Sequence, residues 1–275
     1  MIESLLFPVD FSPSCAAMAA FVQRAAAMFR AKITLLHVCD PVSHDGFELY
    51  SRPVSEIAED HLCVARDRLN GFLRAEFPDA ECNRLLLSGS AGKRIAQCAR
   101  DGRFDLIVMP THAGRFRRML LGSTTASVLN QAECPVLTTQ HAETIAARPL
   151  EHRVWACALS LDDDSERVLR RASQEAQSVG AKLSIIHVLE SGAFRQSASQ
   201  QEARRRLDDL QTAIGSKAEV RIKSGARLES LLAAVKELAA DVLIVGRSRG
   251  GETSGRMGGL THEIVRESAC PVLSL

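Results

Sequence analysis

The stretch Met109–Thr125 carries the residues best suited to bind a charged small molecule. It follows an apolar run, passes three arginines and ends in Gly122-Ser123-Thr124-Thr125, where a helix is expected to begin. A helix start offers unpaired N–H groups and positive dipole, glycine permits close approach, and hydroxyls add donors, so phosphate fits there. The same sequence is also an ordinary helix cap, and this alternative stays open from the residues alone.

Other polar clusters favour structural explanations. His37 and His187 fall late in apolar runs, where a histidine is usually a hydrogen-bonded core residue, whereas His112 lies in the loop described above. Asp162–Asp164 precede an expected helix and suit its dipole. Arg204–Arg206 belong to a helix of mixed charge and predict a solvated face. The eight cysteines form no C-x-x-C pair, so we expect buried apolar thiols rather than a metal site or disulfides.

The second half of the chain repeats the first. Three segments return in the same order: Ile33–Val38 as Leu183–Val188, Asp105–Met109 as Asp241–Val245, and Cys134–Leu137 as Cys270–Leu273. The shift is 150 positions for the first pair (183 − 33) and 136 for the others (241 − 105), so a loop is shorter in the second copy. A repeat of this length is a duplicated domain. We predict domains at residues 1–141 and 151–275, joined by a linker at 142–150.

Apolar runs alternate with helical patterns in both copies. The expected strands are Leu5–Val9, Lys32–Val38, Asn83–Ser88, Asp105–Pro110 and Pro135–Thr139, then Arg153–Leu159, Lys182–Leu189, Ala218–Lys223, Asp241–Gly246 and Pro271–Leu275. The expected helices are Ser12–Arg30, Ser55–Glu76, Ala91–Arg100 and one from Gly122, then Asp163–Val179, Ser197–Ile214, Arg227–Ala239 and Gly259–Glu267. This order predicts an α/β fold: two tandem five-stranded, parallel, doubly wound domains.

Composition excludes several partners. The chain has 34 basic and 33 acidic residues, a net charge of +1, and 46% hydrophobic residues, so we expect no nucleic-acid or membrane partner. No apolar run approaches the roughly 18 residues of a membrane helix. The N-terminal sequence shows no secretory signal, and we expect a cytoplasmic protein.

In a doubly wound sheet, ligands bind beyond the carboxyl ends of the strands. That edge should carry Asp10, Val38, the segment Gly89–Gly92 and the loop Pro110–Thr125. A carboxylate and a phosphate-binding helix start would thus lie on one side of the first domain.

Several motifs occur together and in a fixed order: Pro8-Val-Asp10-Phe-Ser12, Leu36-His-Val38, Asp105-Leu-Ile-Val-Met109, Thr111-His112, Leu120-Leu-Gly122-Ser123 and Glu133-Cys-Pro-Val136. With them the chain resembles a tandem pair of universal stress protein domains. The resemblance implies binding of ATP or ADP with Mg²⁺, without catalytic residues. In nucleotide-binding members an aspartate ending the first strand reads adenine, and a G-x-x-G-x9-G-[ST] loop wraps ribose and phosphates.

Carried onto this sequence, Asp10 takes the adenine role beside Val38, and Gly122 with Ser123 closes on the phosphates. The remaining expected contacts are Thr111, His112, Gly114, Thr124 and Thr125. Pro110 and Ala113 stand where the first two loop glycines are expected, and the spacing to Gly122 is one residue short. Proline removes an N–H and fixes φ, which alters the path of the loop, while Arg115, Arg117 and Arg118 can neutralise phosphate or face solvent.

The second copy departs differently. Ser160 stands at the position of Asp10, Gly246 stands at the first loop glycine, and Gly258-Gly259 replaces Gly122-Ser123. We expect this copy to bind nucleotide weakly or not at all and to serve as the structural partner of the first.

Three functions follow for testing. The first is a non-catalytic adenine-nucleotide-binding protein of stress response and signalling, with nucleotide mainly in domain 1. The alternative is a nucleotide-independent protein-interaction module, and the last is a hydrolase, disfavoured because no Walker-type Gly-Lys-[Ser/Thr] occurs. The resemblance also implies pairing through the last strands, here Pro135–Thr139 with Pro271–Leu275 as an intrachain pseudo-dimer. It leaves room for a homodimer and for a signalling partner that the sequence does not name.

Overall fold

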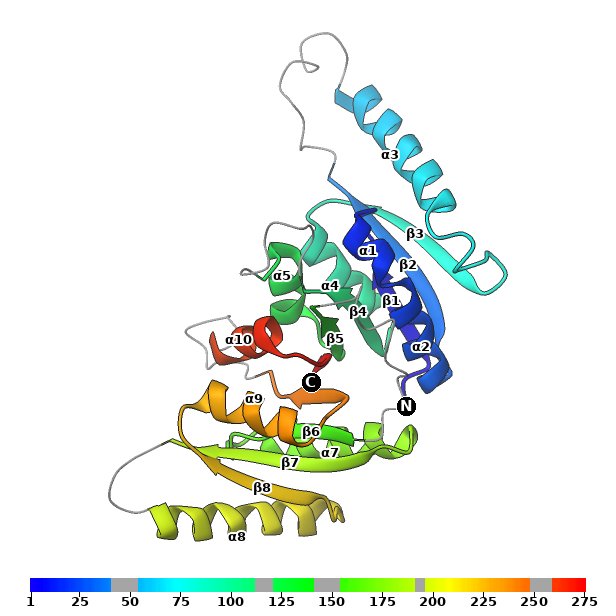
Figure 1. Ribbon diagram of the computed structural model, residues 1–275. Coiled ribbons are helices and arrows are strands. Elements are labelled where there is room, and N and C mark those ends of the chain that lie inside the picture. The colour runs from blue at the N-terminus through cyan, green and yellow to red at the C-terminus, as the bar shows by residue number, and fades with distance from the viewer. Residues whose placement is uncertain (41–53, 112–120, 141–153, 191–195, 248–258) are drawn as a thin grey trace. The chain divides into compact units, whose positions relative to one another are not determined.

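The computed structural model describes residues 1–40, 54–111, 121–140, 154–190, 196–247 and 259–275 (Figure 1). It is an α/β protein whose sheets are mostly parallel, which confirms the predicted fold class. The chain forms two compact units. The first contains Ile2–Pro135, and the second contains β5 (Val136–Thr139) and the chain from β6 (Val154–Ala158) onward. Among the described helices, none combines the length and the apolar character needed to cross a membrane.

The first unit is built on a parallel sheet in the order β3-β2-β1-β4. Its strands are β1 (Ser4–Pro8), β2 (Lys32–Cys39), β3 (Cys82–Ser88) and β4 (Leu106–Pro110). Leu5, Leu6 and Phe7 are fully buried, because helices cover both faces of such a sheet. All four strands point the same way, so their carboxyl ends share one edge.

Five helices of the first unit are described: α1 (Pro13–Ala17), α2 (Ala19–Phe29), α3 (Val54–Gly71), α4 (Ala91–Asp101) and α5 (Ser123–Gln131). Helix α3 packs along β3, and α4 packs against α5 (Figure 1). The Ser12 hydroxyl accepts the N–H of Cys15 at 3.1 Å, and Pro13 occupies the first turn of α1, as the sequence predicts.

Two predicted helix boundaries were wrong. The helix expected over Ser12–Arg30 divides at Met18, whose N–H bonds to the carbonyl of Cys15, three residues back, and so tightens the turn. The helix expected to reach Glu76 ends at Gly71, because Leu73 adopts a left-handed φ of 51° that α-helix cannot continue.

The second unit carries the strand order β5-β10-β9-β6-β7-β8. Its further elements are β7 (Lys182–Leu189), β8 (Glu219–Ser224), β9 (Val242–Val245), β10 (Val272–Ser274), α7 (Ser165–Ser178), α8 (Gln196–Ile214), α9 (Arg227–Glu237) and α10 (Gly259–Glu267). Strand β5 runs antiparallel to β10, with Leu137 opposite Leu273, whereas the other pairs are parallel. Trp155, the single tryptophan of the chain, is buried in β6.

Strand registers establish which positions correspond in the two copies. Leu35 lies opposite Arg84 in the first unit, and Ile185 lies opposite Val220 in the second. The shift is therefore 150 positions before the second helix (185 − 35) and 136 after it (220 − 84). Ser160 thus occupies the structural place of Asp10.

Candidate functional site

The turn after β1 presents Asp10 at the carboxyl edge of the first sheet. One oxygen of its carboxylate, Oδ1, accepts the N–H of Ser12 at 2.9 Å. Between them Phe11 adopts a left-handed φ of 60°. The carboxylate is exposed and held close to the start of α1, so its direction is set by the backbone of the turn.

His37 fastens the neighbouring strand to this turn. Its Nδ1 lies 2.8 Å from the carbonyl oxygen of Val9, and the N–H of Val9 donates to the carbonyl of Leu36 at 2.8 Å. A carbonyl oxygen only accepts, so Nδ1 carries the hydrogen. This confirms the structural role predicted for His37.

The start of α5 faces the same edge. The N–H of Gly122 donates to the carbonyl of Thr111 at 2.9 Å, and the hydroxyl of Thr125 donates to the carbonyl of Pro110 at 2.9 Å. No described side chain caps α5, so its first-turn N–H groups are available to a ligand. Both ends of the segment between β4 and α5 are therefore tied together beside an open helix start.

A cavity of about 380 Å³ connects these groups. It is lined by predicted site residues (Asp10, Val38, Gly122, Ser123, Thr124 and Thr125) and by Pro8, Val9, Cys15, Leu36, His37, Ala91, Ile95, Met109, Pro110 and Leu121. This volume is typical of small-molecule sites. The lining combines one carboxylate, hydroxyls at a helix start and an apolar floor, and its described residues include no lysine or arginine.

The remaining predicted contacts do not line the cavity. Thr111 is buried, with 2% of its surface exposed, and is not among the lining residues. His112, Ala113 and Gly114 lie outside the described residues, as do Arg115, Arg117 and Arg118.

Sequence reasoning did not single out Cys15 or Ile95 as wall residues. Ile95 lies about one helical turn beyond Ala91, which was already placed at this edge, and Cys15 lies about one turn beyond Ser12, the start of the helix that follows Asp10. That spacing is the signal that identifies them. Burial raises the pKa of the Cys15 thiol to about 12. Cys15 is therefore a neutral apolar wall group and no nucleophile.

The second unit has a cavity of about 450 Å³ at the corresponding edge. His187 repeats the role of His37, with Nδ1 2.8 Å from the carbonyl of Leu159. The chemistry of the wall differs at three equivalent positions. Ser160 replaces Asp10, Leu260 replaces Thr124, and Arg227 replaces Ala91. The carboxylate directly after the first strand and one hydroxyl of the helix start are thereby lost, and an apolar side chain and a cation are gained. Asp162, two positions beyond Ser160, places a different carboxylate in the wall.

Packing against a neighbouring helix explains why residue 246 is a glycine. A Cβ at this position would lie 2.9 Å from Cγ2 of Val168 in α7. The glycine that stands at the first loop position of the second copy is therefore required by helix packing, independently of any ligand.

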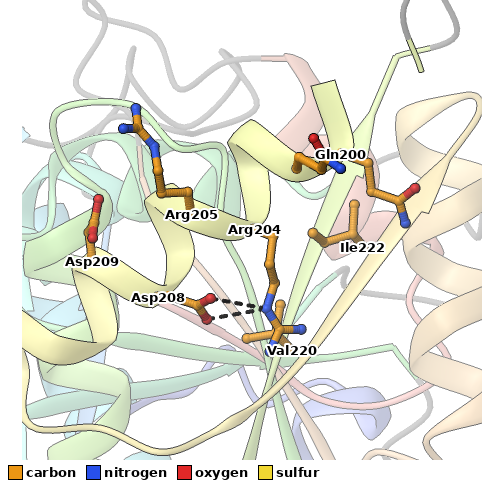
Figure 2. Close-up of a pocket in the computed structure, with 8 residues that line it drawn as sticks. Gln200, Arg204, Arg205, Asp208, Asp209, Val220 and Ile222 are labelled. Carbon is orange, nitrogen blue, oxygen red and sulfur yellow. Dashed lines mark hydrogen bonds and ion pairs between the residues drawn. The ribbon is translucent and has the colours of Figure 1, made fainter. Parts of the chain in front are cut away.

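A separate groove of about 690 Å³ lies between α8 and β8 (Figure 2). Arg204 pairs with Asp208 at 3.2 Å, as the dashed lines in Figure 2 show, and Arg205 pairs with Glu202 at 3.1 Å. These side chains are mostly exposed and neutralise one another. The mixed-charge segment is thus the solvated face predicted from sequence.

Comparison with known proteins decides the family. The universal stress protein family model matches residues 1–140 and again 156–275. The chain belongs to the universal stress protein family. It is a tandem member, because the two matches together cover nearly all of its length.

Relatives support this assignment. A universal stress protein from Thermus aquaticus is 28% identical over 138 residues, which cover 50% of this chain and 98% of that protein. A universal stress protein structure from Archaeoglobus fulgidus matches with a TM-score of 0.72 and 21% identity, covering 98% of this chain and 97% of the other. A putative universal stress protein from Pseudomonas aeruginosa matches with a TM-score of 0.66 and 18% identity, covering 100% and 93%. These structures share the fold of the whole tandem chain.

Burial of His187 predicts that acid destabilises the second unit of this universal stress protein. Burial, with smaller contributions from Arg206 and Arg227, lowers the pKa of His187 below its ordinary value, and burial lowers the pKa of His262 as well. The unfolded chain then binds more protons than the folded one, so the free energy of unfolding falls as pH drops below about 6.5. Each histidine contributes at most about 1.4 kcal/mol per pH unit.

The measurement is denaturant unfolding followed by Trp155 fluorescence, from about pH 7.5 to about 5.5. His187→Asn retains a donor for the carbonyl of Leu159 and does not titrate, so its pH dependence should be shallower, with the part due to His262 remaining. An unchanged slope in this variant would contradict the assignment.

Proposed function

We propose that this universal stress protein is a non-catalytic adenine-nucleotide-binding protein that takes ATP or ADP, with Mg²⁺, in the first unit. One observation carries the proposal: a single cavity joins the Asp10 carboxylate to the open start of α5 with its hydroxyl side chains. A carboxylate accepts hydrogen bonds from an amino group such as that of adenine, and a helix start binds phosphate.

Magnesium fits the charge of this site. The described lining contains no lysine or arginine, so helix N–H groups alone would face the phosphate charge there. Neutralising that charge would fall to Mg²⁺ carried by the nucleotide, together with arginines of the loop. Binding should therefore weaken when EDTA replaces Mg²⁺.

The second unit is proposed to bind nucleotide weakly or not at all and to serve as the structural partner of the first. Ser160 supplies no carboxylate at the place of Asp10. The carboxylate that lines this cavity is that of Asp162, whose Oδ1 already accepts the N–H of Asp164 and the hydroxyl of Ser165. Leu260 removes a hydroxyl from the start of α10. Strand β5 pairs with β10 within the second unit, and the intrachain pseudo-dimer stays a prediction from the family resemblance. We further propose that the protein acts in the cytoplasm.

The first test is calorimetric titration with MgATP into the millimolar range. We expect one site per chain, and Asp10→Ala should weaken binding roughly 10- to 100-fold, because it removes a charged acceptor worth about 1.5–3 kcal/mol. Ser160→Ala is the matched control at the same place in the second unit and should leave affinity and stoichiometry unchanged. Two equivalent sites, or an unaffected Asp10→Ala variant, would contradict the assignment.

The second candidate is a protein-interaction module without nucleotide. Pro110 favours it, since the residue has no N–H and its carbonyl is already bonded to Thr125. No saturable heat with MgATP would select this function. Whether bound ATP is hydrolysed is a separate question, which an assay of phosphate release answers. The proposal expects bound ATP to remain intact.

A further inference from the structure

The turn after the first strand of each copy has the same strained backbone. In the first copy this turn carries Asp10, and in the second copy it carries Ser160. Phe11 has φ of 60° and its counterpart Leu161 has φ of 59°. Left-handed backbone is unfavourable for a bulky residue and persists only where surrounding contacts hold it. The two copies use different side chains at this position, so the shared feature is the backbone conformation.

In the first unit, α3 and the residue following it hold the turn. The ring of Phe11 lies 4.2 Å from the ring of His37 and 5.2 Å from that of Phe72, centroid to centroid. The guanidinium of Arg68 lies 4.7 Å from the centroid of the Phe11 ring, which is the geometry of a cation–π contact. The side chain after Asp10 is therefore enclosed from two elements, β2 and the end of α3.

In the second unit, an arginine at the corresponding place performs the same task by other chemistry. Nη2 of Arg206 in α8 donates to the carbonyl of Leu161 at 2.5 Å. Arg206 corresponds to Arg68, because each lies between two buried residues one helical turn apart. These are Ala65 and Leu69 in α3 and Ala203 and Leu207 in α8, and both pairs are separated by 138 positions (203 − 65 and 207 − 69). Both copies thus tie the turn after their first strand to the second long helix.

We infer that Phe11, Arg68 and Phe72 are positioning residues that aim the Asp10 carboxylate at the cavity. The backbone of Phe11 sets the path between Asp10 and Ser12, whose N–H holds Oδ1. We call the contacts of Arg68 and Phe72 with the Phe11 ring the clamp. When the clamp is removed, the turn relaxes to right-handed or extended backbone, this hydrogen bond is lost, and the carboxylate turns away from the cavity. The nucleotide consequence rests on the proposed function, whereas the clamp itself does not.

The clamp can be tested without nucleotide by amide hydrogen exchange at Ser12. Arg68→Met and Phe11→Ala should both accelerate exchange there, and Phe11→Ala should act more strongly, because alanine loses all the ring contacts and keeps the unfavourable left-handed backbone. Phe11→Gly loses the same contacts but relieves the backbone strain, so its exchange should accelerate less than that of Phe11→Ala. Arg66→Met, on the exposed surface of the same helix, is the matched control and should change nothing, while Arg68→Lys keeps a cation over the ring and should restore part of the protection.

Nucleotide affinity supplies the second measurement. Arg68→Met should weaken MgATP binding roughly two- to five-fold, as expected for loss of an exposed cation–π contact. The same substitution in the Asp10→Asn background should have a smaller effect, because the arginine acts through that carboxylate. Ser12 exchange unchanged in both Arg68→Met and Phe11→Ala overturns the inference. Faster exchange in a protein that never binds MgATP supports the clamp and refutes the proposed function.

Discussion

Replacing Arg84 with methionine is expected to lower the free energy of unfolding of the first unit by about 3 kcal/mol. The side chain of Arg84 is only 7% exposed. Its guanidinium donates to the carbonyls of Leu69 (3.2 Å), Phe72 (3.1 Å) and Phe77 (2.8 Å). Methionine fills similar volume but leaves these acceptors without their donor: Leu69 in the last turn of α3, and Phe72 and Phe77 in the segment that follows it.

Two variants separate this role from a surface ion pair. Arg74 bonds to Asp79 at 2.6 Å, yet both side chains are more than half exposed, so Arg74→Met should cost no more than about 1 kcal/mol. Arg84→Lys keeps the charge but cannot reproduce the planar fork, and it should be intermediate.

Far-UV circular dichroism during urea unfolding measures both units, whereas Trp155 reports on the second unit alone. Arg84→Met should therefore shift the circular dichroism transition to lower urea ahead of the fluorescence transition. Equal midpoints for Arg84→Met and Arg74→Met would contradict the predicted role of Arg84.

The second copy ends its corresponding helix differently, which explains why Arg84 has no counterpart. Val220 occupies the place of Arg84, and α8 ends at Ile214, followed by Gly215 with a left-handed φ of 69°. The N–H of Ser216 then donates to the carbonyl of Gln211 at 2.9 Å, so the backbone satisfies its own final carbonyls. Helix α3 lacks such a glycine cap, and a side chain from β3 supplies the donors.

Features fixed by local pattern could be predicted from the sequence. Apolar runs such as Leu5–Val9 identify buried strands, and parallel strands bring their carboxyl ends to one edge, so Asp10 and Gly122 were expected near each other. The cavity does contain both residues. Their role in nucleotide binding stays a prediction, because it depends on a ligand rather than on the fold.

Features fixed by distant partners could not be predicted. The last turn of α3 is bonded by Arg84, a residue of β3 that lies 15 positions from Leu69 along the chain, in a strand paired with β2. The left-handed backbone of Phe11 depends on rings and a cation from β2 and α3, and phenylalanine in isolation disfavours that conformation. The pairing of β5 with β10 was implied only by the family resemblance, because apolar runs identify strands but not their partners.

Gly92→Ala is expected to damage stability and nucleotide binding together, because this glycine sets the distance between the two helices that line the first cavity. A Cβ at Gly92 would lie 2.3 Å from Oγ and 2.4 Å from Cβ of Ser127 in α5. The hydroxyl can rotate, but Cβ of Ser127 moves only with its helix. We expect a loss of about 2–3 kcal/mol in the free energy of unfolding.

The effect on binding follows from the position of α5. Moving this helix away from α4 carries Ser123 and Thr124 with it, and both line the cavity. We expect MgATP affinity to fall by roughly tenfold, about 1.4 kcal/mol. Gly259→Ala is the matched control, since a Cβ there meets nothing within 4 Å at the start of α10, and it should leave both properties unchanged.

A second substitution distinguishes helix spacing from a general loss of fold. Ser127→Gly removes the atoms that the new Cβ would strike, so Gly92→Ala with Ser127→Gly should recover affinity more completely than stability. Stability should recover less because glycine inside a helix itself costs about 1 kcal/mol relative to alanine. If the double variant binds MgATP no better than Gly92→Ala alone, the contact with Ser127 does not set the cavity. If it binds like the wild type, the separation of α4 and α5 is the dimension that makes the start of α5 accessible to phosphate.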